Sequence, residues 1–203
     1  MKLIRWLLII CLTLFVLESA EAGTYSLNLR YEPSKDLSSL RGKIGSTLAM
    51  ALFKDERPET LYIGRHTNFE GDVTYFKSNP FPLEKAISDS LSDVFSRDGI
   101  KTIPASSWDD KPESLKNMET DSVLMIEIKR FWTEGNGSLL GTKVKSGVRL
   151  VIHLGVKKEG KIFTRNVEVE KEMTVPRSTA ERVETMMNQM LTEIFDSYFS
   201  NPY

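Results

Sequence analysis

Only one cysteine, Cys11, occurs among the 203 residues, and histidine occurs only twice, as His66 and His153. Cys11 lies within an apolar N-terminal run and follows two isoleucines, whereas a lipoprotein signal places a small residue directly before its cysteine. Removal of that run leaves a chain without cysteine, which excludes disulfides, thiolate metal sites and cysteine nucleophiles. A chain of this length without disulfides must be stabilised by an ordinary hydrophobic core.

The sequence also lacks an excess of either charge, with 27 lysines and arginines against 28 aspartates and glutamates. A nucleic-acid-binding domain needs a strong basic excess, so we expect no nucleic-acid partner. No phosphate-binding loop, dinucleotide fingerprint or nucleophile elbow is present. These absences predict a protein that is not an enzyme, with no catalytic residues, no bound metal and no cofactor.

The N-terminus has the composition of a secretory signal. Lys2 and Arg5 precede an apolar run from Trp6 to Leu17, and small residues lead up to Ala22. This order predicts export, cleavage of residues 1–22 and a periplasmic protein. The alternative is an uncleaved segment that anchors the protein to a membrane, although a bilayer span needs about 20 apolar residues.

The remaining residues, 23–203, are sufficient for a single domain. Alternation of apolar and polar residues predicts strands, and apolar residues three and four apart predict helices. The expected strands are 24–31, 44–55, 72–79, 100–105, 121–135, 142–158 and 161–175, and the expected helices are 82–99, 109–118 and 178–198.

Two of the expected helices are amphipathic. The first, 82–99, has prolines at its start and Gly99 at its end. The second follows Ser178 and Glu181, which are spaced as in a capping box. Their apolar stripes need a sheet to pack against, so we predict an α+β domain. Its sheet is expected to be mostly antiparallel, with both helices packed on one face.

The register of the last two strands is predicted from their turn. If Glu159 and Gly160 form a two-residue turn, Lys158 lies opposite Lys161. One face of the hairpin is then apolar and the other pairs opposite charges, and such directly opposed partners stabilise a sheet. The predicted pairs are Val156 with Phe163, Ile152 with Val167, Leu150 with Val169, His153 with Asn166, Arg149 with Glu170 and Gly147 with Glu172, besides two that fit poorly, Leu154 with Arg165 and Val148 with Lys171.

Asp55 and Arg57 lie between two apolar stretches and are followed by Pro58. Aspartate favours turns by accepting a hydrogen bond from a backbone N–H two residues on. Pro58 biases the residue before it toward extended geometry. We therefore interpret the pair as one that shapes a turn. The alternative is a partner-binding loop that contains Asp55, Arg57 and His66.

Neither histidine has the surroundings of a characteristic site. Glu70 and Asp72 follow His66 closely, and together they could ligate a metal. A single histidine without a known ligand spacing, however, is more typical of a polar loop. His153 is expected to be a solvated residue on the polar face of a strand.

A basic stripe follows one face of the expected strand 142–158. It could bind an anionic lipid or glycan of the cell envelope. The expected partner strand carries glutamates on the matching face, which favours mutual neutralisation of charge instead. The stripe consists of Lys143, Lys145, Arg149 and Lys157.

The chain resembles the YajG-like family of bacterial cell-envelope lipoproteins from Tyr31 to its end. The resemblance rests on the motifs YEP, FKDERPETLYIG, VFSRDGI and SVLMIEIKRF, and on a C-terminal helix that follows a charged strand. It implies a periplasm-facing α+β domain, associated with the outer membrane and without an established enzymatic role. The lipidated cysteine of the family is missing here, which favours a soluble periplasmic form.

Two functions of different classes follow from these observations. The first is a protein-interaction or assembly-accessory module at the outer membrane, with envelope proteins as partners, and homo-oligomers and peripheral membrane association as further options. The alternative is a periplasmic binder of a small envelope ligand, such as a lipid or glycan fragment. An interaction module should expose an apolar patch or a free sheet edge, whereas a ligand binder should enclose an apolar cavity.

Overall fold

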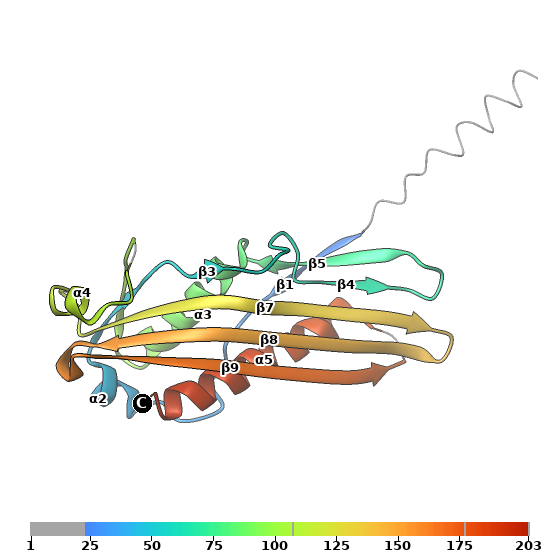
Figure 1. The fold of residues 1–203 in the computed structure, drawn as a ribbon. Coiled ribbons are helices and arrows are strands. Elements are labelled where there is room, and N and C mark those ends of the chain that lie inside the picture. Colours follow the sequence, from blue (N-terminus) through green and yellow to red (C-terminus); the bar gives the residue numbers. More distant parts are fainter. Residues whose placement is uncertain (1–22, 107, 177, 203) are drawn as a thin grey trace, which may run out of the picture.

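The computed structural model describes residues 23–202 except Ser107 and Arg177, so the expected signal peptide, residues 1–22, lies outside the described residues. Figure 1 shows an elongated domain in which long strands run side by side. The strands are β1 (Thr24–Asn28), β2 (Thr47–Met50), β3 (Lys54–Asp55), β4 (Gly64–Thr67), β5 (Val73–Asn79), β6 (Lys101–Pro104), β7 (Ser122–Ser138), β8 (Gly141–Val156) and β9 (Lys161–Val175). The helices are α2 (Leu40–Ile44), α3 (Leu83–Arg97), α4 (Pro112–Lys116) and α5 (Ala180–Ser200), with a 3₁₀ turn, η2 (Lys157–Glu159).

Three long strands form the centre of the sheet. β7, β8 and β9 pair antiparallel along most of their length. On its other side β7 pairs in succession with the short strands β2, β3 and β4, and β6, β5 and β1 lie beyond them. The domain is therefore α+β, as predicted. The long pairings are antiparallel, whereas five short pairings in the described chain are parallel, so the sheet is mixed.

Lys129 is an extra residue in β7. The register with β8 shifts between Ile128 and Arg130, which is the pattern of a β-bulge. Before the bulge the even-numbered side chains, such as Ile126, belong to the main core, and after it Phe131 does. One added residue moves every following side chain to the opposite face of a strand. The bulge therefore allows a single long strand to contribute side chains to the same core before and after Lys129.

The β8–β9 hairpin differs from its predicted register by two residues. Its loop contains four residues rather than two, namely η2 and Gly160, which has a φ of 60°. The observed pairs place Val156 opposite Lys161, so the register predicted from a two-residue turn is wrong. Because the error is an even number of residues, each side chain stays on its expected face. The two pairs that fitted poorly are replaced, since Leu154 lies opposite Phe163 and Val148 opposite Val169, whereas Ile152 now lies opposite Arg165. The other observed pairs include Arg149 with Glu168, Gly147 with Glu170 and His153 with Thr164.

Both amphipathic helices contribute to one hydrophobic cluster with the sheet. Figure 1 shows α3 and α5 behind the strands. A smaller cluster around Trp108 and Leu115 includes Val123 and Met125 of β7. The side chain of Thr179 caps α5 by accepting from the N–H of Arg182 at 3.3 Å. The apolar stripe of α5 consists of Val183, Met186, Met187, Met190, Leu191, Ile194, Phe195, Tyr198 and Phe199.

An extended segment, residues 28–34, lies along α5 and is held by side chains of that helix. Successive contacts are four residues apart in the helix and two apart in the segment. Four helical residues rise about 6 Å, and two extended residues span about 6.6 Å, so the two spacings match. The bonds run from the N–H of Asn28 to Glu184 (2.7 Å), Arg30 to Asn188 (2.9 Å), Glu32 to Thr192 (3.4 Å) and Ser34 to Asp196 (3.0 Å).

Two sequence-based expectations for this region need correction. α2 lies almost entirely in a stretch, residues 32–43, for which the sequence predicted neither a strand nor a helix. The strand expected over 24–31 ends at Asn28, because the following residues bond to helix side chains instead of to another strand. Within the described residues, no helix is long and apolar enough to cross a membrane.

Candidate functional site

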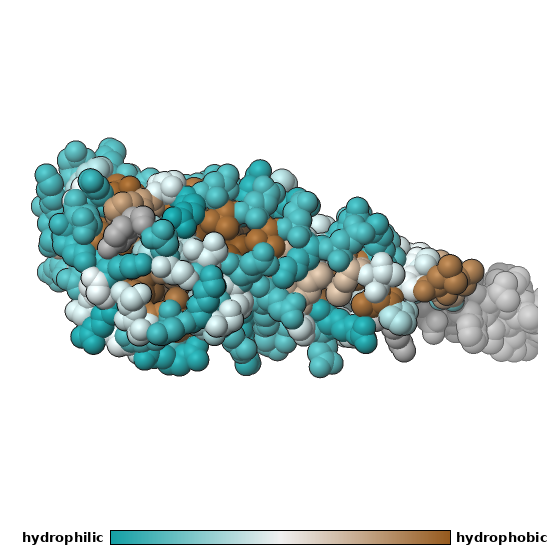
Figure 2. Space-filling view, turned by 90° about the horizontal axis from the view of Figure 1, so that it is seen from below, coloured by the Kyte–Doolittle hydropathy of each residue, from teal (hydrophilic) through white to brown (hydrophobic). Residues whose placement is uncertain are grey.

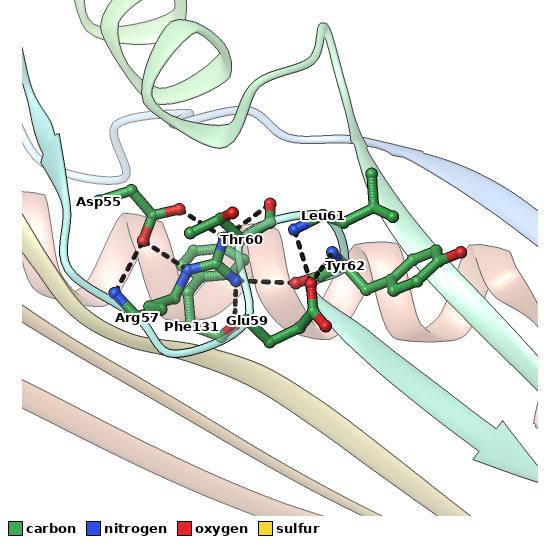
Figure 3. A network of polar contacts seen from close by, with 7 residues as sticks. All are labelled: Asp55, Arg57, Glu59, Thr60, Leu61, Tyr62 and Phe131. Carbon is green, nitrogen blue, oxygen red and sulfur yellow. Dashed lines mark hydrogen bonds and ion pairs between the residues drawn. The ribbon is translucent and has the colours of Figure 1, made fainter.

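Asp55 and Arg57 form a buried ion pair at the point where β3 leads into the loop before β4 (Figure 3). The Nε and Nη2 atoms of Arg57 donate to the two carboxylate oxygens of Asp55 at 2.8 and 2.6 Å. The backbone N–H of Arg57 also donates to Asp55, at 3.2 Å. Both side chains are less than 5% exposed. The pair is therefore a bidentate contact shielded from water.

The remaining N–H groups of Arg57 hold the loop against the sheet. Nη1 donates to the carbonyls of Tyr62 at 2.9 Å and Phe131 at 3.0 Å, and Nη2 donates to the carbonyl of Thr60 at 3.4 Å. A guanidinium has five N–H donors, and these contacts use all of them. Glu59 closes the other side of the loop by accepting from the N–H of Leu61 at 2.7 Å. In this geometry Arg57 has no donor left for an external ligand.

An apolar hollow of about 230 Å³ lies beside this network. Pro58, Phe131 and Trp132 contribute to its lining. It is smaller than the 300–1,000 Å³ that is usual for a small-molecule site. His66, which the sequence grouped with this loop, lies on β4 and lines a different hollow of about 410 Å³. The structure therefore does not bring the three predicted residues to one hollow.

His66 packs against Gly135 of the neighbouring strand β7, and its buried Nε2 atom has no hydrogen-bond partner among the residues that the structure describes. The carboxylate of Asp72 accepts from the side chain of Asn68 at 2.8 Å, and the Asn68 oxygen accepts from the N–H of Glu70 at 2.9 Å. The side chain of Asn68 therefore stabilises the turn between β4 and β5. Across the described chain, no three histidine, aspartate or glutamate side chains are placed to hold a metal.

The partial burial of His66 predicts a dependence of stability on pH. Burial lowers its pKa from the ordinary value of 6.5, so the unfolded chain takes up a proton before the folded protein does. Stability is therefore complete above a pH of about 6.5 and falls as the pH drops below it. Thermal unfolding between about pH 7 and pH 5 should show a modestly steeper loss of melting temperature for the wild type than for His66→Gln. Equal slopes would contradict this role.

The basic stripe is part of a surface of mixed charge. Glu172 binds the ammonium groups of Lys143 at 2.6 Å and Lys145 at 3.4 Å, and Lys157 donates to the carbonyl of Met118 at 2.5 Å. Arg149 lies opposite Glu168. Two of the four predicted cations thus share one carboxylate, which reduces the positive field of the stripe.

A cluster of charged groups around His153 was not predicted. His153 is 8% exposed, so its expectation as a solvated residue is wrong. Its Nδ1 atom lies 3.0 Å from a carboxylate oxygen of Asp110 and 3.1 Å from the hydroxyl of Thr164. Its Nε2 atom lies 3.9 Å from Glu127, beyond hydrogen-bond distance. Asp110 has a φ of 54°, an uncommon value for a residue other than glycine.

This cluster ties the loop before α4 to the sheet. A contact with Lys129 is the main cause that lowers the pKa of Glu127, which keeps this carboxyl ionised. Asp110 orients the His153 ring, as a carboxylate does in catalytic triads. A triad also requires a nucleophile bonded to the other ring nitrogen, but Nε2 of His153 has no partner among the described residues. The contact between Asp110 and His153 therefore attaches the loop to the sheet.

Comparison with known proteins supports the fold. No family model matches the sequence, and no curated protein is similar to it. The structure is similar to that of a DUF330 protein from Xanthomonas campestris, with a TM-score of 0.56, 15% identity, and coverage of 88% of this chain and 93% of that one. A more remote similarity is to a lipoprotein from Neisseria meningitidis, with a TM-score of 0.42, 13% identity and coverage of 74% and 99%. The chain thus shares its fold with a bacterial DUF330 protein, while membership of the YajG-like family stays a prediction.

Proposed function

We propose that the protein is a non-enzymatic component of the cell envelope that binds another protein at the outer membrane as an interaction or assembly-accessory module. The composition of the N-terminus supports export, and the fold is one that a DUF330 protein also adopts. The observation that carries the proposal is the outer edge of β9. This strand of 15 residues pairs with β8 on one side and with no other strand of the described chain.

A free sheet edge of this length offers a row of backbone N–H and C=O groups to a partner strand. An extended peptide can add to such an edge, with affinity from main-chain bonds and specificity from alternate side chains. Even-numbered residues of β9, such as Glu168 and Glu170, are exposed on one face. These charges discourage indiscriminate pairing between edges. The partner we expect is an envelope protein that supplies a strand.

The binder of a small ligand remains the second candidate. Two hollows have volumes of about 860 and 730 Å³, which are sufficient for a ligand. Their linings, however, are rich in charged and amide side chains such as Asp89, Arg97, Asn188 and Glu193. A lipid fragment needs a predominantly apolar lining, so these grooves disfavour a lipid, while a glycan fragment stays the alternative ligand.

Site-specific photo-crosslinking in living cells tests the proposal. A photoreactive amino acid at Asn166 or Glu170 of β9 should give one discrete adduct with an envelope protein. The matched control carries the same amino acid at Ser88 of α3, and it should give no adduct of that size. Hydrogen exchange of the purified complex with that envelope protein should then show more protection of the β9 amides than in the protein alone. Adducts that form equally from Ser88, or no new protection in β9, would overturn the proposal.

A further inference from the structure

The turn between β7 and β8 consists of Leu139 and Leu140, which are 87% and 97% exposed. Tight hairpin turns favour asparagine, aspartate or glycine, because such residues accept the backbone angles that these turns need. A leucine pair at this position serves neither the turn nor the core, since neither side chain is covered. Exposed consecutive apolar residues indicate a binding function.

Two exposed aromatic residues lie at the same end of the molecule. Phe69, 60% exposed, is in the turn between β4 and β5, and Tyr25, 56% exposed, is on β1. Both line the hollow of about 410 Å³ together with Gly137 and Ser138 of the β7 end. The β4–β5 turn approaches β7 closely, because a Cβ atom on Gly137 would lie 2.9 Å from the backbone N of Phe69. Figure 2 shows hydrophobic side chains at the narrow end of the molecule.

We propose that this end, defined by Tyr25, Phe69, Leu139 and Leu140, docks on the surface of a lipid bilayer. The described chain begins at this end, since Gly23 contacts Thr74 beside the β4–β5 turn. The apolar run of the N-terminal sequence precedes it. If the run is not cleaved, a membrane that held it would be attached to the domain at this end. Aromatic and leucine side chains on projecting tips are suited to the interfacial region of a bilayer.

The charges around this end indicate that docking depends on apolar insertion rather than on attraction to anionic lipid. Glu70 and Asp72 are exposed in the same turn as Phe69. The nearby lysines, Lys143 and Lys145, share the carboxylate of Glu172. Among the described residues, this end therefore has no net basic patch, and polybasic segments are what anionic membranes attract. The bilayer we expect has zwitterionic headgroups, and binding to it should depend little on salt.

Sedimentation with vesicles tests this inference. The chain from Gly23 to Tyr203, which contains every described element and both hydrophobic clusters, should sediment with phosphatidylcholine–phosphatidylethanolamine vesicles. The double variant Leu139→Ser with Leu140→Ser should bind at least ~10-fold more weakly, since serine lacks the apolar surface that each leucine transfers from water into the bilayer. Leu52→Ser is the matched control, because Leu52 is 67% exposed but lines a hollow beside α3. It should bind as the wild type does.

Several results would overturn the inference. These are a wild type that does not bind the vesicles, a double variant that binds equally well, or binding that requires anionic lipid and disappears at high salt. A double variant that only changes the oligomeric state would indicate that a second copy covers this end. Unchanged melting temperatures show that both variants fold. The inference takes only the cell-envelope location from the proposed function. Vesicle binding can fail while crosslinking at β9 succeeds, and the reverse, so the two proposals are tested separately.

Discussion

Replacement of Arg57 by alanine is expected to lower the free energy of unfolding by about 3–5 kcal/mol, because it leaves the buried carboxylate of Asp55 without its partner. The same change removes three donors to loop and strand carbonyls, so the turn before β4 loses its attachment to β7. Stabilities of single domains are about 5–15 kcal/mol in total. Urea unfolding followed by circular dichroism measures the difference.

Two control variants separate charge from geometry at this position. Arg57→Lys retains the positive charge but cannot form the two-pronged contact, so its loss should be smaller than that of alanine. Alanine at both Asp55 and Arg57 should be less destabilising than the sum of the single changes, because no charge then remains buried. An alanine variant at Arg57 that loses less than about 1 kcal/mol would show that water reaches Asp55.

Replacement of Asp196 by alanine is expected to cost about 3 kcal/mol, since it leaves the buried hydroxyl of Tyr31 unpaired and also removes two hydrogen bonds from the exposed Ser34. Asp196 is 3% exposed and accepts from the hydroxyl of Tyr31 at 2.8 Å and from the N–H and hydroxyl of Ser34 at 3.0 and 2.5 Å. Burial, and then the contact with Asp196, raise the pKa of Tyr31 above its ordinary range, so the phenol stays protonated and donates. Chemical denaturation gives the size of the loss.

Tyr31→Phe is the matched control for Asp196→Ala. It removes a single donor and leaves both contacts of Ser34 in place, so we expect a loss of about 1–2 kcal/mol. Thr192→Ala, in the same row of helix contacts, should cost about 1 kcal/mol, because the two bonds that it loses, from the N–H and to the carbonyl of Glu32, are neutral and exposed. Equal losses for Asp196→Ala and Tyr31→Phe would contradict the role assigned to the carboxylate.

The fold could be predicted from the sequence where its signals are local. The apolar spacing of α3 and α5 and the terminal Gly99 are properties of neighbouring residues, and each is found in the structure. The bulge at Lys129 and the four-residue loop that ends at Gly160 could not be predicted, because each adds residues that alternation alone does not reveal. The parallel pairings join distant strands, whose order no local pattern encodes.

In the candidate sites, too, contacts between neighbouring residues could be predicted and contacts between distant residues could not. Asp55 and Arg57 are two residues apart, so their contact could be predicted from spacing and from the turn preference of aspartate. Asp110 and His153 lie far apart in the sequence and meet only because β8 and the loop before α4 are adjacent in space. The exposure of the leucine pair at the β7–β8 turn could not be predicted, since it becomes evident only when the strands on both sides are known.

The contacts between residues 28–34 and α5 determine the order in which the chain can complete its fold. Their partners are 156 to 162 residues apart, so the backbone near the N-terminus has to wait for the last helix to be synthesised. Contacts of such separation slow folding, because a long loop has to close before they form. A ribosome-bound chain that ends before Ala180 therefore lacks the four helix side chains that hold residues 28–34.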